Sequence, residues 1–575
     1  MTAVMTDDQT PSPPAERRAR RGRGSVSAKL VLGSAAAVLV VLVVYPLFWL
    51  VLGSLGGTDT FTFSNYLRVV SDPGLYDALI NTLLIAAGSC VISLVAGVPI
   101  AWLISRTNIP GKGLLRMLTS VSFMIPGFLS ALAYVMLMAP NNGWLNRLVV
   151  SVTGAERGPF NIYSLPGITM VTSFGVMAYV VMLTSAALDS VDSGLEQSAR
   201  ILGASRWKIL MGITLPLVTP ALLASALLVF VQSLALFGSH AILGLPVQIY
   251  TLPTRIYSLF AFPPDYGAAT ALSMMLVLLT VGCLYLQRRM LARRSYITTG
   301  GKAGVHETHD LGRLKWPALI GCHAFFALAV YFPVCVLLLT SLMAAQGSGL
   351  TLDNFTFDNY VAVLFESSLT QRAATNSLIV AGSAATLGVL LGALIAYINF
   401  RVKPRGAKIL DYLATIPLGL PGIVLAVGLV LAWIRLPVAV YGTLAILLIA
   451  YLTRYIPLGV RSADSALRQI DPSLEEAGRI SGGSWLRSMV EITLPLMKGG
   501  LVAGWSLIFV QAIGELAVAI MLFTVGTETI AVVIYQRSEE GHFEEVAALS
   551  MIVLIATALI LGLTRRLTRA SVTRF

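Results

Sequence analysis

The chain has 575 residues, of which 56% are hydrophobic and only 12% are charged. Soluble domains carry about 25% charged residues, so this composition excludes a single soluble core and a disordered chain. Apolar runs such as Leu30 to Thr58 also exceed the strands of a membrane β-barrel, which rarely stay apolar for more than about 10 residues. At roughly 20 residues per crossing, the sequence predicts an all-α polytopic membrane protein with about twelve transmembrane helices.

The apolar segments divide evenly between the two halves of the chain. The predicted spans are residues 30–55, 79–105, 114–138, 166–189, 215–238 and 268–287, followed by 316–343, 373–400, 409–434, 438–460, 495–523 and 545–564. The predicted domains are a basic cytoplasmic tail (1–29), a first transmembrane domain (30–287), a basic, glycine-containing linker (288–315) and a second transmembrane domain (316–575).

The basic residues predict how these spans are oriented. With both termini in the cytoplasm, the inner segments and span ends hold 33 of the 40 Lys and Arg residues, and the outer segments hold 7. A shift by one span would remove this asymmetry, which is the positive-inside bias of membrane proteins. The net charge of +12 is therefore explained by orientation, and we expect a lipid bilayer and no nucleic acid as a partner.

The two halves repeat each other in sequence. Short matches recur at offsets of 294–295 residues early in each half and of 279 residues later: Asn81-Thr82-Leu83 with Asn376-Ser377-Leu378, Ile100-Ala101-Trp102 before Arg106 with Ile395-Ala396-Tyr397 before Arg401, Pro126-Gly127 with Pro421-Gly422, and Val231-Gln232 with Val510-Gln511. An extra outer loop, 141–164, accounts for the change of offset. Because each repeat contains six spans, the two repeats are predicted to be parallel.

A duplicated motif lies between the fourth and fifth spans of each half, on the predicted cytoplasmic side. The first copy runs from Leu195 to Pro216 and the second from Leu474 to Pro495. Each copy indicates a short amphipathic helix, a glycine break, a second short helix and a proline that opens the next span. Asp471-Pro472 is typical of an N-cap followed by proline in the first helical turn, and glycine permits the sharp turn.

This motif resembles the EAA loop of the inner-membrane permeases of binding-protein-dependent ABC importers. The family pattern is E-A-A, three residues, G, nine residues and I-x-L-P. The second copy matches with Glu476, Ala477, Gly478 and Gly482, and the first with Gln197, Ser198, Ala199 and Gly203. Gln197 replaces the acidic residue and Gly478 the second alanine. The adjacent Glu196 and Glu475 are candidates for the missing ionic contact.

The resemblance implies the type I ABC importer permease fold in the plasma membrane of a bacterium. In that family the EAA helix docks in a groove of an ATPase subunit, so the residues named above are candidate coupling residues. The chain has no G-x-x-x-x-G-K-[ST] motif, so we expect no catalytic residue and no cofactor in this chain. All four cysteines fall in apolar segments, so we expect no metal site. An ATPase dimer that binds ATP and an extracytoplasmic binding protein are the expected partners.

Three polar residues within the predicted spans are candidate pathway residues. Glu515 lies in the predicted eleventh span, where a carboxylate should face a cavity or a partner. Its alternative role is a structural hydrogen bond, and the first half has Leu236 at the equivalent position. Gln232 and Gln511 form an equivalent pair, with interhelical hydrogen bonding as the alternative.

Two polar segments outside the spans have simpler interpretations. The acidic segment 538–545 is expected to be a solvated outer loop, with a cation site or binding-protein contact as the alternative. The linker segment 306–310, His-Glu-Thr-His-Asp, is interpreted as a chance polar sequence, because its spacing is not H-E-x-x-H.

The fused format with two permease domains most closely resembles the ferric-iron permeases. Thiamine and 2-aminoethylphosphonate permeases share that format and remain alternatives. From another class, a secondary transporter driven by an ion gradient is the alternative, although it has no need for two EAA loops.

Overall fold

The computed structural model describes residues 32–57, 61–292, 308–348, 351–404, 406–435, 437 and 439–572. The predicted basic tail 1–29 and the central part of the predicted linker, 293–307, lie outside these residues. The described residues form helices and short loops, with two isolated β-bridges and no β-strand among them.

The first half contains helices from the start of the described chain to the linker. Their bounds are η1 (Val40–Val44), α2 (Tyr45–Ser54), α3 (Ser64–Ser71), α4 (Pro73–Arg106), α5 (Lys112–Met124), α6 (Gly127–Met138), α7 (Trp144–Thr153), α8 (Leu165–Ser190), α9 (Ser193–Ile201), α10 (Arg206–Ile209), η2 (Leu210–Thr214), α11 (Leu215–Ala235), α12 (Gly238–Gly244), η3 (Leu245–Val247), α13 (Leu252–Ser258) and α14 (Tyr266–Ala292).

The second half repeats this order without a counterpart of α7. Its bounds are η4 (Gly312–Leu314), α15 (Lys315–Phe326), η5 (Ala327–Tyr331), α16 (Phe332–Ser341), η6 (Gln346–Ser348), η7 (Leu352–Asn354), α17 (Asp358–Val361), η8 (Ala362–Glu366), α18 (Ser368–Tyr397), η9 (Ile398–Val402), α19 (Ala407–Thr415), η10 (Ile416–Gly419), α20 (Gly422–Trp433), α21 (Leu444–Leu467), α22 (Pro472–Ile480), α23 (Trp485–Ser488), η11 (Met489–Thr493), α24 (Leu494–Ile513), α25 (Ala519–Leu522), α26 (Ile530–Glu539) and α27 (Phe543–Val572).

Ten continuous helices of the described chain are long and apolar enough to cross a membrane, and each coincides with a predicted span. The other two predicted spans, 114–138 and 409–434, are broken. Helices α5 and α6 meet at 95°, and the segment Ala407–Gly419 meets α20 at 113°. The breaks fall at Pro126-Gly127 and Pro421-Gly422, where proline removes a helical donor and disfavours the helical conformation of the residue before it.

The hydrogen bonds between α4 and α8 show that the first broken pair still crosses the bundle. The Ser89 hydroxyl donates to the Thr169 carbonyl at 3.2 Å, and the Ser105 hydroxyl donates to the Ser185 carbonyl at 3.4 Å. This constant offset of 80 residues means that α4 and α8 are parallel. The chain between them must therefore return to the starting end, so α5 and α6 together form one crossing.

Two further helix ends differ from the predictions. Helix α11 ends at Ala235 and α24 ends at Ile513, whereas the predicted spans continued to 238 and 523. The short, buried helices α12 and α25 follow instead. Glu515 therefore lies in the break after α24 rather than inside a spanning helix. At the other end, α10 and η2 are continuous with α11, so Pro216 lies within the helix and does not open it.

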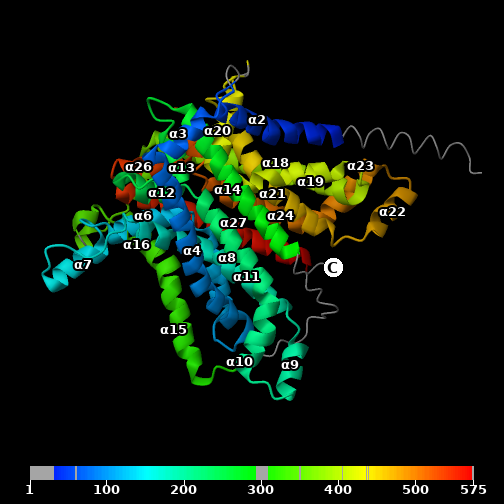
Figure 1. The fold of residues 1–575 in the computed structure, drawn as a ribbon, viewed down its shortest axis with the longest axis horizontal. Helices are drawn as coiled ribbons and strands as arrows, with labels where there is room; N and C mark the ends of the chain where they lie inside the picture. Colours follow the sequence, from blue (N-terminus) through cyan, green and yellow to red (C-terminus); the bar gives the residue numbers. More distant parts are fainter. Residues whose placement is uncertain are drawn as a thin grey trace, which may run out of the picture.

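The two halves separate toward the end of the bundle that carries α9 and α22, called the EAA end below. In Figure 1, α4, α8 and α11 form one group, and α18, α21 and α24 form another. The groups come together around α13 and α20, which contact each other, and diverge toward α9 and α22.

Candidate functional site: two coupling helices and a central ion pair

Helices α9 and α22 are built from the same local signals. An aspartate precedes each helix, and its carboxylate accepts from a backbone N–H two residues ahead: Asp192 from Gly194 at 2.8 Å, and Asp471 from Ser473 at 2.9 Å. This confirms the predicted N-cap at Asp471. The bond from the Ser473 backbone N–H is the main reason why the pKa of Asp471 lies below its usual value of 3.8.

Both helices end at the predicted glycines. Gly203 has φ +83° and Gly482 has φ +88°, a conformation that other residues rarely adopt. A Cβ at either position would meet no atom within 4 Å. The backbone conformation alone therefore requires glycine, and it turns the chain from each short helix back toward the next span.

A buried carboxylate ties α22 to the end of α18. Glu475 Oε1 lies 3.1 Å from Arg401 Nε and accepts from the Thr493 hydroxyl at 2.8 Å. Glu475 Oε2 accepts from the Tyr397 hydroxyl at 2.9 Å. Arg401 also donates to the Ile470 carbonyl at 2.6 Å. These contacts join three segments of the second half around one carboxylate.

The first half repeats this arrangement around Glu196. Its Oε2 lies 3.6 Å from Arg106 Nη1, and its Oε1 accepts from the Thr214 hydroxyl at 2.7 Å. Arg106 also donates to the Leu188 carbonyl at 2.8 Å. The repeated Arg106 and Arg401, and the threonines of the two I-T-L-P segments, therefore have a common structural role.

The exposed residues of the two helices differ from the buried carboxylates. Glu196 and Glu475 are only 5% and 4% exposed, so neither presents the ionic contact that the sequence suggested as a substitute. The reason is helical phase, because both point toward the arginine at the end of the neighbouring span. The exposed EAA residues are instead Gln197 and Ser198 in α9, and Glu476 and Ala477 in α22.

Apolar side chains accompany these polar groups at the surface. Ile201 and Ile480, at equivalent positions, are each 87% exposed, and Leu195 and Leu474 are about half exposed. Gly478, which replaces an alanine of the family pattern, is partly buried, and a Cβ there would lie 2.6 Å from the terminal methyl group of Ile492. Each helix therefore presents a mixed polar and apolar face.

The end of the linker packs beside the first of these helices. His309 donates its backbone N–H to the Arg106 carbonyl at 2.7 Å, and its ring stacks on Trp102 with a centroid distance of 6.1 Å. Asn108 donates to Asp310 at 2.6 Å. His309, Asp310 and Trp102 border a cavity of about 290 Å³ that Glu196 also lines. The segment 308–310 is therefore ordered against the first half, whereas His306 and Glu307 lie outside the described residues.

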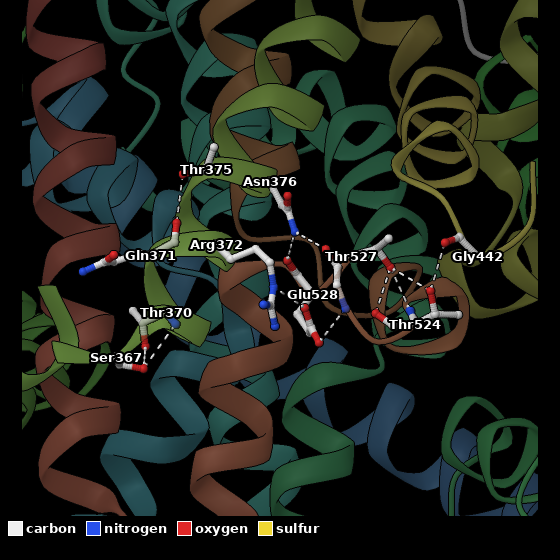
Figure 2. A network of polar contacts seen from close by, with 11 residues as sticks. Ser367, Thr370, Gln371, Arg372, Thr375, Asn376, Gly442, Thr524, Thr527 and Glu528 are labelled. Atoms are coloured by element: carbon white, nitrogen blue, oxygen red, sulfur yellow. Dashed lines mark hydrogen bonds and ion pairs between the residues drawn. The ribbon is translucent and has the colours of Figure 1, made fainter. Parts of the chain in front are cut away.

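At the opposite end, the repeated Asn-Thr and Asn-Ser dipeptides anchor the chain before α13 and α26. Asn81 donates to the Tyr250 carbonyl at 3.0 Å, and Asn376 donates to the Glu528 carbonyl at 3.0 Å. Figure 2 shows Asn376 above the loop that carries Thr527 and Glu528, with Arg372 on the same helix directed at the Glu528 carboxylate at 3.4 Å. The repeat in the sequence therefore marks a structural anchor.

An ion pair occupies the break after α24. Glu515 Oε2 lies 2.8 Å from Arg454 Nε and accepts from the Tyr455 hydroxyl, while its Oε1 accepts from the Val518 backbone N–H at 3.1 Å. The carboxylate therefore caps the chain that leads into α25. The Glu515 side chain is 6% exposed and that of Arg454 is 25% exposed.

The comparisons with known proteins agree with the duplicated architecture. The model of the family described as "binding-protein-dependent transport system inner membrane component" matches residues 93–296 and, separately, residues 388–574. The chain belongs to this family.

Several relatives of this permease are similar over one or both halves. It is 28% identical over 544 residues to the ferric transport system permease protein FbpB of Actinobacillus pleuropneumoniae, covering 93% of this chain and 78% of that protein. It is 29% identical over 510 residues to the putative ferric transport system permease protein FbpB 1 of Haemophilus influenzae, covering 87% and 79%. The molybdenum transport system permease protein ModB of Escherichia coli K12 is 29% identical over 219 residues, covering 37% of this chain and 91% of that protein.

The remaining polar candidates of the permease differ in their contacts. The Gln232 amide donates to the Tyr179 hydroxyl of α8 at 2.7 Å, a bond between helices of one half. The backbone carbonyl of Gln511 accepts from the Tyr455 hydroxyl at 3.1 Å, next to the ion pair. In the segment 538–545, Arg537 faces both Glu540 and Glu545, so two of its four glutamates share one basic partner.

The sequence analysis did not single out Arg454, although it lies within the predicted span 438–460. A charged residue in an apolar segment was the available signal, the same one that identified Glu515. Its importance depends on a contact between spans that composition does not reveal. The first half has Gly175 and Leu236 where the second has Arg454 and Glu515, so both charges belong to one half.

Proposed function

We propose that this permease forms the passage of an ATP-driven importer for ferric iron, which an extracytoplasmic binding protein delivers. The observation that carries the proposal is the pair of equivalent helices at the EAA end. Each helix is tied to its own half by a buried carboxylate and presents an exposed, partly apolar face. Two such faces fit two identical partner subunits, as expected for an ATPase dimer.

The coupling follows from these attachments. Glu196 joins α9 to the end of α4 and the start of α11, and Glu475 joins α22 to the corresponding segments of the second half. A displacement of either short helix by the ATPase subunit therefore pulls directly on the long helices. Because the halves diverge toward this end, such movement changes the opening between them.

The orientation and the composition of the complex belong to the same proposal. The EAA end, the tail 1–29 and the C-terminus face the cytoplasm, which agrees with the distribution of Lys and Arg. ATP binds to the separate ATPase chains. Ferric iron as the cargo is supported by the two FbpB relatives, which are named as ferric transport system permease proteins.

The test is uptake of radioactive iron by a bacterial strain that lacks this gene. The intact chain should restore uptake when the ATPase and binding protein are present, and Gly482→Pro at equal membrane abundance should not. If the chain restored uptake of thiamine or 2-aminoethylphosphonate but not of iron, ferric iron would be excluded as the cargo. Uptake without any ATPase, driven by an ion gradient, would contradict an ATP-driven importer and favour a secondary transporter.

A further inference from the structure

We infer that Arg454, held in place by Glu515, contacts the cargo between the two halves, and that the cargo presents anionic oxygen atoms. The inference rests on the proposed import function and narrows the chemical class of what is imported. Four observations lead to it: the packing around the pair, the exposed stripe on α21, the equivalent stripe on α8 and the difference in exposure between the two charged groups.

The ion pair lies where the two halves meet. A Cβ at Gly514, directly before Glu515, would lie 2.7 Å from Cγ of Pro126, which belongs to the broken span of the first half. A Cβ at Gly238 of the first half would lie 3.6 Å from Leu516, directly after it. The break that carries Glu515 therefore packs against the break of the opposite half.

The second half also leaves room for the guanidinium. A Cβ at Gly422 would lie 2.4 Å from Arg454 Nη1. Gly422 follows Pro421 at the break of the second half, so this glycine allows Arg454 to reach the centre. The equivalent positions of the first half, Gly175 and Leu236, carry neither charge. The pair is therefore an addition to the shared architecture.

Arg454 begins a stripe of accessible residues on α21. Leu458 is partly buried, and Arg461 and Ser465 are exposed, at spacings of four, seven and eleven residues from Arg454. These spacings place them on one face of the helix, which opens toward the EAA end. Arg461 adds a second cation to this stripe.

The first half has an equivalent stripe on α8. Tyr179 is partly buried, while Met182 and Ala186, further along the same face, are exposed. The Tyr179 hydroxyl accepts from the Gln232 amide at 2.7 Å. Tyr179 occupies the position equivalent to Leu458 of α21, so both halves have a partly accessible residue at this place.

Within the pair, the cationic group is the more accessible one. The Glu515 carboxylate pairs with Arg454, accepts hydrogen bonds from Tyr455 and Val518 and is nearly buried. In contrast, a quarter of the Arg454 side chain is exposed. A guanidinium attracts carboxylate and phosphate oxygens and repels a bare metal ion. Glu515 is a positioning residue here, and the expected cargo is a free oxyanion or a ferric complex whose outer ligands are oxyanions.

The first experiment uses the complete complex, with ATPase and binding protein, in proteoliposomes. The double variant Arg454→Gln/Glu515→Gln keeps both polar side chains and removes both charges. Uptake should fall about tenfold or more, because a charge-assisted contact to the cargo is lost. ATP hydrolysis stimulated by the loaded binding protein should persist. A matched control, Arg372→Gln/Glu528→Gln, removes a similar pair elsewhere in the same half and should leave uptake within about twofold.

A charge-restoration experiment separates cargo contact from packing. Arg454→Cys/Glu515→Gln, with the four native cysteines replaced, is treated with an ethylammonium or an ethylsulfonate methanethiosulfonate reagent. The ammonium adduct should restore uptake and the sulfonate adduct should not. Equal rescue by both reagents, or wild-type uptake by the double Gln variant, would overturn the inference while leaving the import function intact.

Labelled iron and labelled anions distinguish a ferric complex from a free oxyanion as the cargo. Radioactive iron is offered with labelled citrate or labelled phosphate, and each labelled anion is also offered alone. Entry of iron together with the anion identifies a ferric complex, and entry of the anion alone identifies a free oxyanion. If neither anion changed iron uptake and neither labelled anion entered with the iron, a cargo with anionic oxygen atoms would be contradicted. Absence of iron uptake with entry of an anion would contradict only the ferric proposal.

Discussion

Arg401 and Glu475 form an ion pair that attaches helix α22 to the end of the long helix α18, with 3.1 Å between Nε and Oε1. Arg106 and Glu196 occupy the equivalent positions in the first half. In both halves the glutamate directly precedes the first residue of the EAA triplet. Adjacent residues of one short helix therefore point in different directions, one toward the bundle and one toward the exposed face.

This geometry predicts different consequences for Glu475 and its neighbour. Glu475→Ala leaves the largely buried Arg401 without its carboxylate. Breaking a fully buried pair costs about 3–5 kcal/mol, and partial exposure of Arg401 lowers this cost. We expect lower membrane abundance and a lower thermal midpoint of the purified permease. Glu476→Ala should leave both unchanged, because Glu476 is exposed. Equal thermal midpoints for the two variants would contradict the structural role of Glu475.

The left-handed conformation at Gly482 predicts a graded series of substitutions. Gly482→Pro should abolish transport while the protein remains inserted, because proline cannot adopt φ +88°. Gly482→Asn should retain most transport, since asparagine tolerates this conformation and a Cβ there meets no atom within 4 Å. Uptake is measured at matched membrane abundance. Normal uptake by the Pro variant would exclude a role for this turn in coupling.

Composition and repetition predicted the architecture well because each acts over many residues. Hydropathy located the spans, and the internal repeat identified both coupling helices and their terminal glycines. The breaks at Pro126-Gly127 and Pro421-Gly422 were not predicted, although these dipeptides were found as a repeat. A proline within an apolar segment can kink, end or leave a helix nearly continuous, and only packing decides among these outcomes.

The candidate site was predicted less completely, because it depends on helical phase and on contacts between distant segments. The sequence placed Glu196 and Glu475 beside the motif but did not show that they face Arg106 and Arg401. Repetition of both residues in both halves was a signal for such a pairing. Arg454 was missed because its partner, Glu515, lies far along the chain in the break after another span, and neither periodicity nor local spacing connects the two.

The exposed position 476 provides a charge test with a control taken from the first copy of the motif. Glu476→Arg should abolish transport without affecting insertion, because it reverses the charge of the face expected to meet the ATPase. Glu476→Gln should retain transport, since Gln197 occupies the same place in α9. Retention of the ATPase subunit during purification is measured alongside uptake. Retention by the Arg variant together with normal uptake would contradict docking at this face.

The N-cap of α22 predicts a dependence on acidity. The folded-state pKa of Asp471 lies below its usual value of 3.8, first because its carboxylate accepts from the Ser473 N–H. A lowered pKa means that the cap stabilises α22 above about pH 4 and that this contribution is lost as pH falls through the folded pKa. Asp471→Asn keeps an acceptor without the charge. Protection of the 472–480 amides from hydrogen exchange, expressed relative to the intrinsic rate at each pH, should fall at acidic pH in the wild type and change less in the Asn variant; identical pH profiles of protection would contradict the role of the charge.

The proposed orientation predicts opposite accessibility for α7 and α9. Both helices carry exposed side chains, and they lie at opposite ends of the parallel helices α4 and α8, so a membrane-impermeant thiol reagent distinguishes their sides. In a background without the four native cysteines, Val152→Cys, at a position 77% exposed, should be labelled in intact cells. Arg200→Cys should be labelled only after permeabilisation, in cells without the ATPase subunit that would cover it.

Positions in 141–164 and 538–545 should be labelled like position 152, and positions in 195–205 and 474–485 should be labelled like position 200. Strong labelling of position 200 in intact cells would reverse the topology, because the coupling helices would then face away from the cytoplasm, where ATP is available.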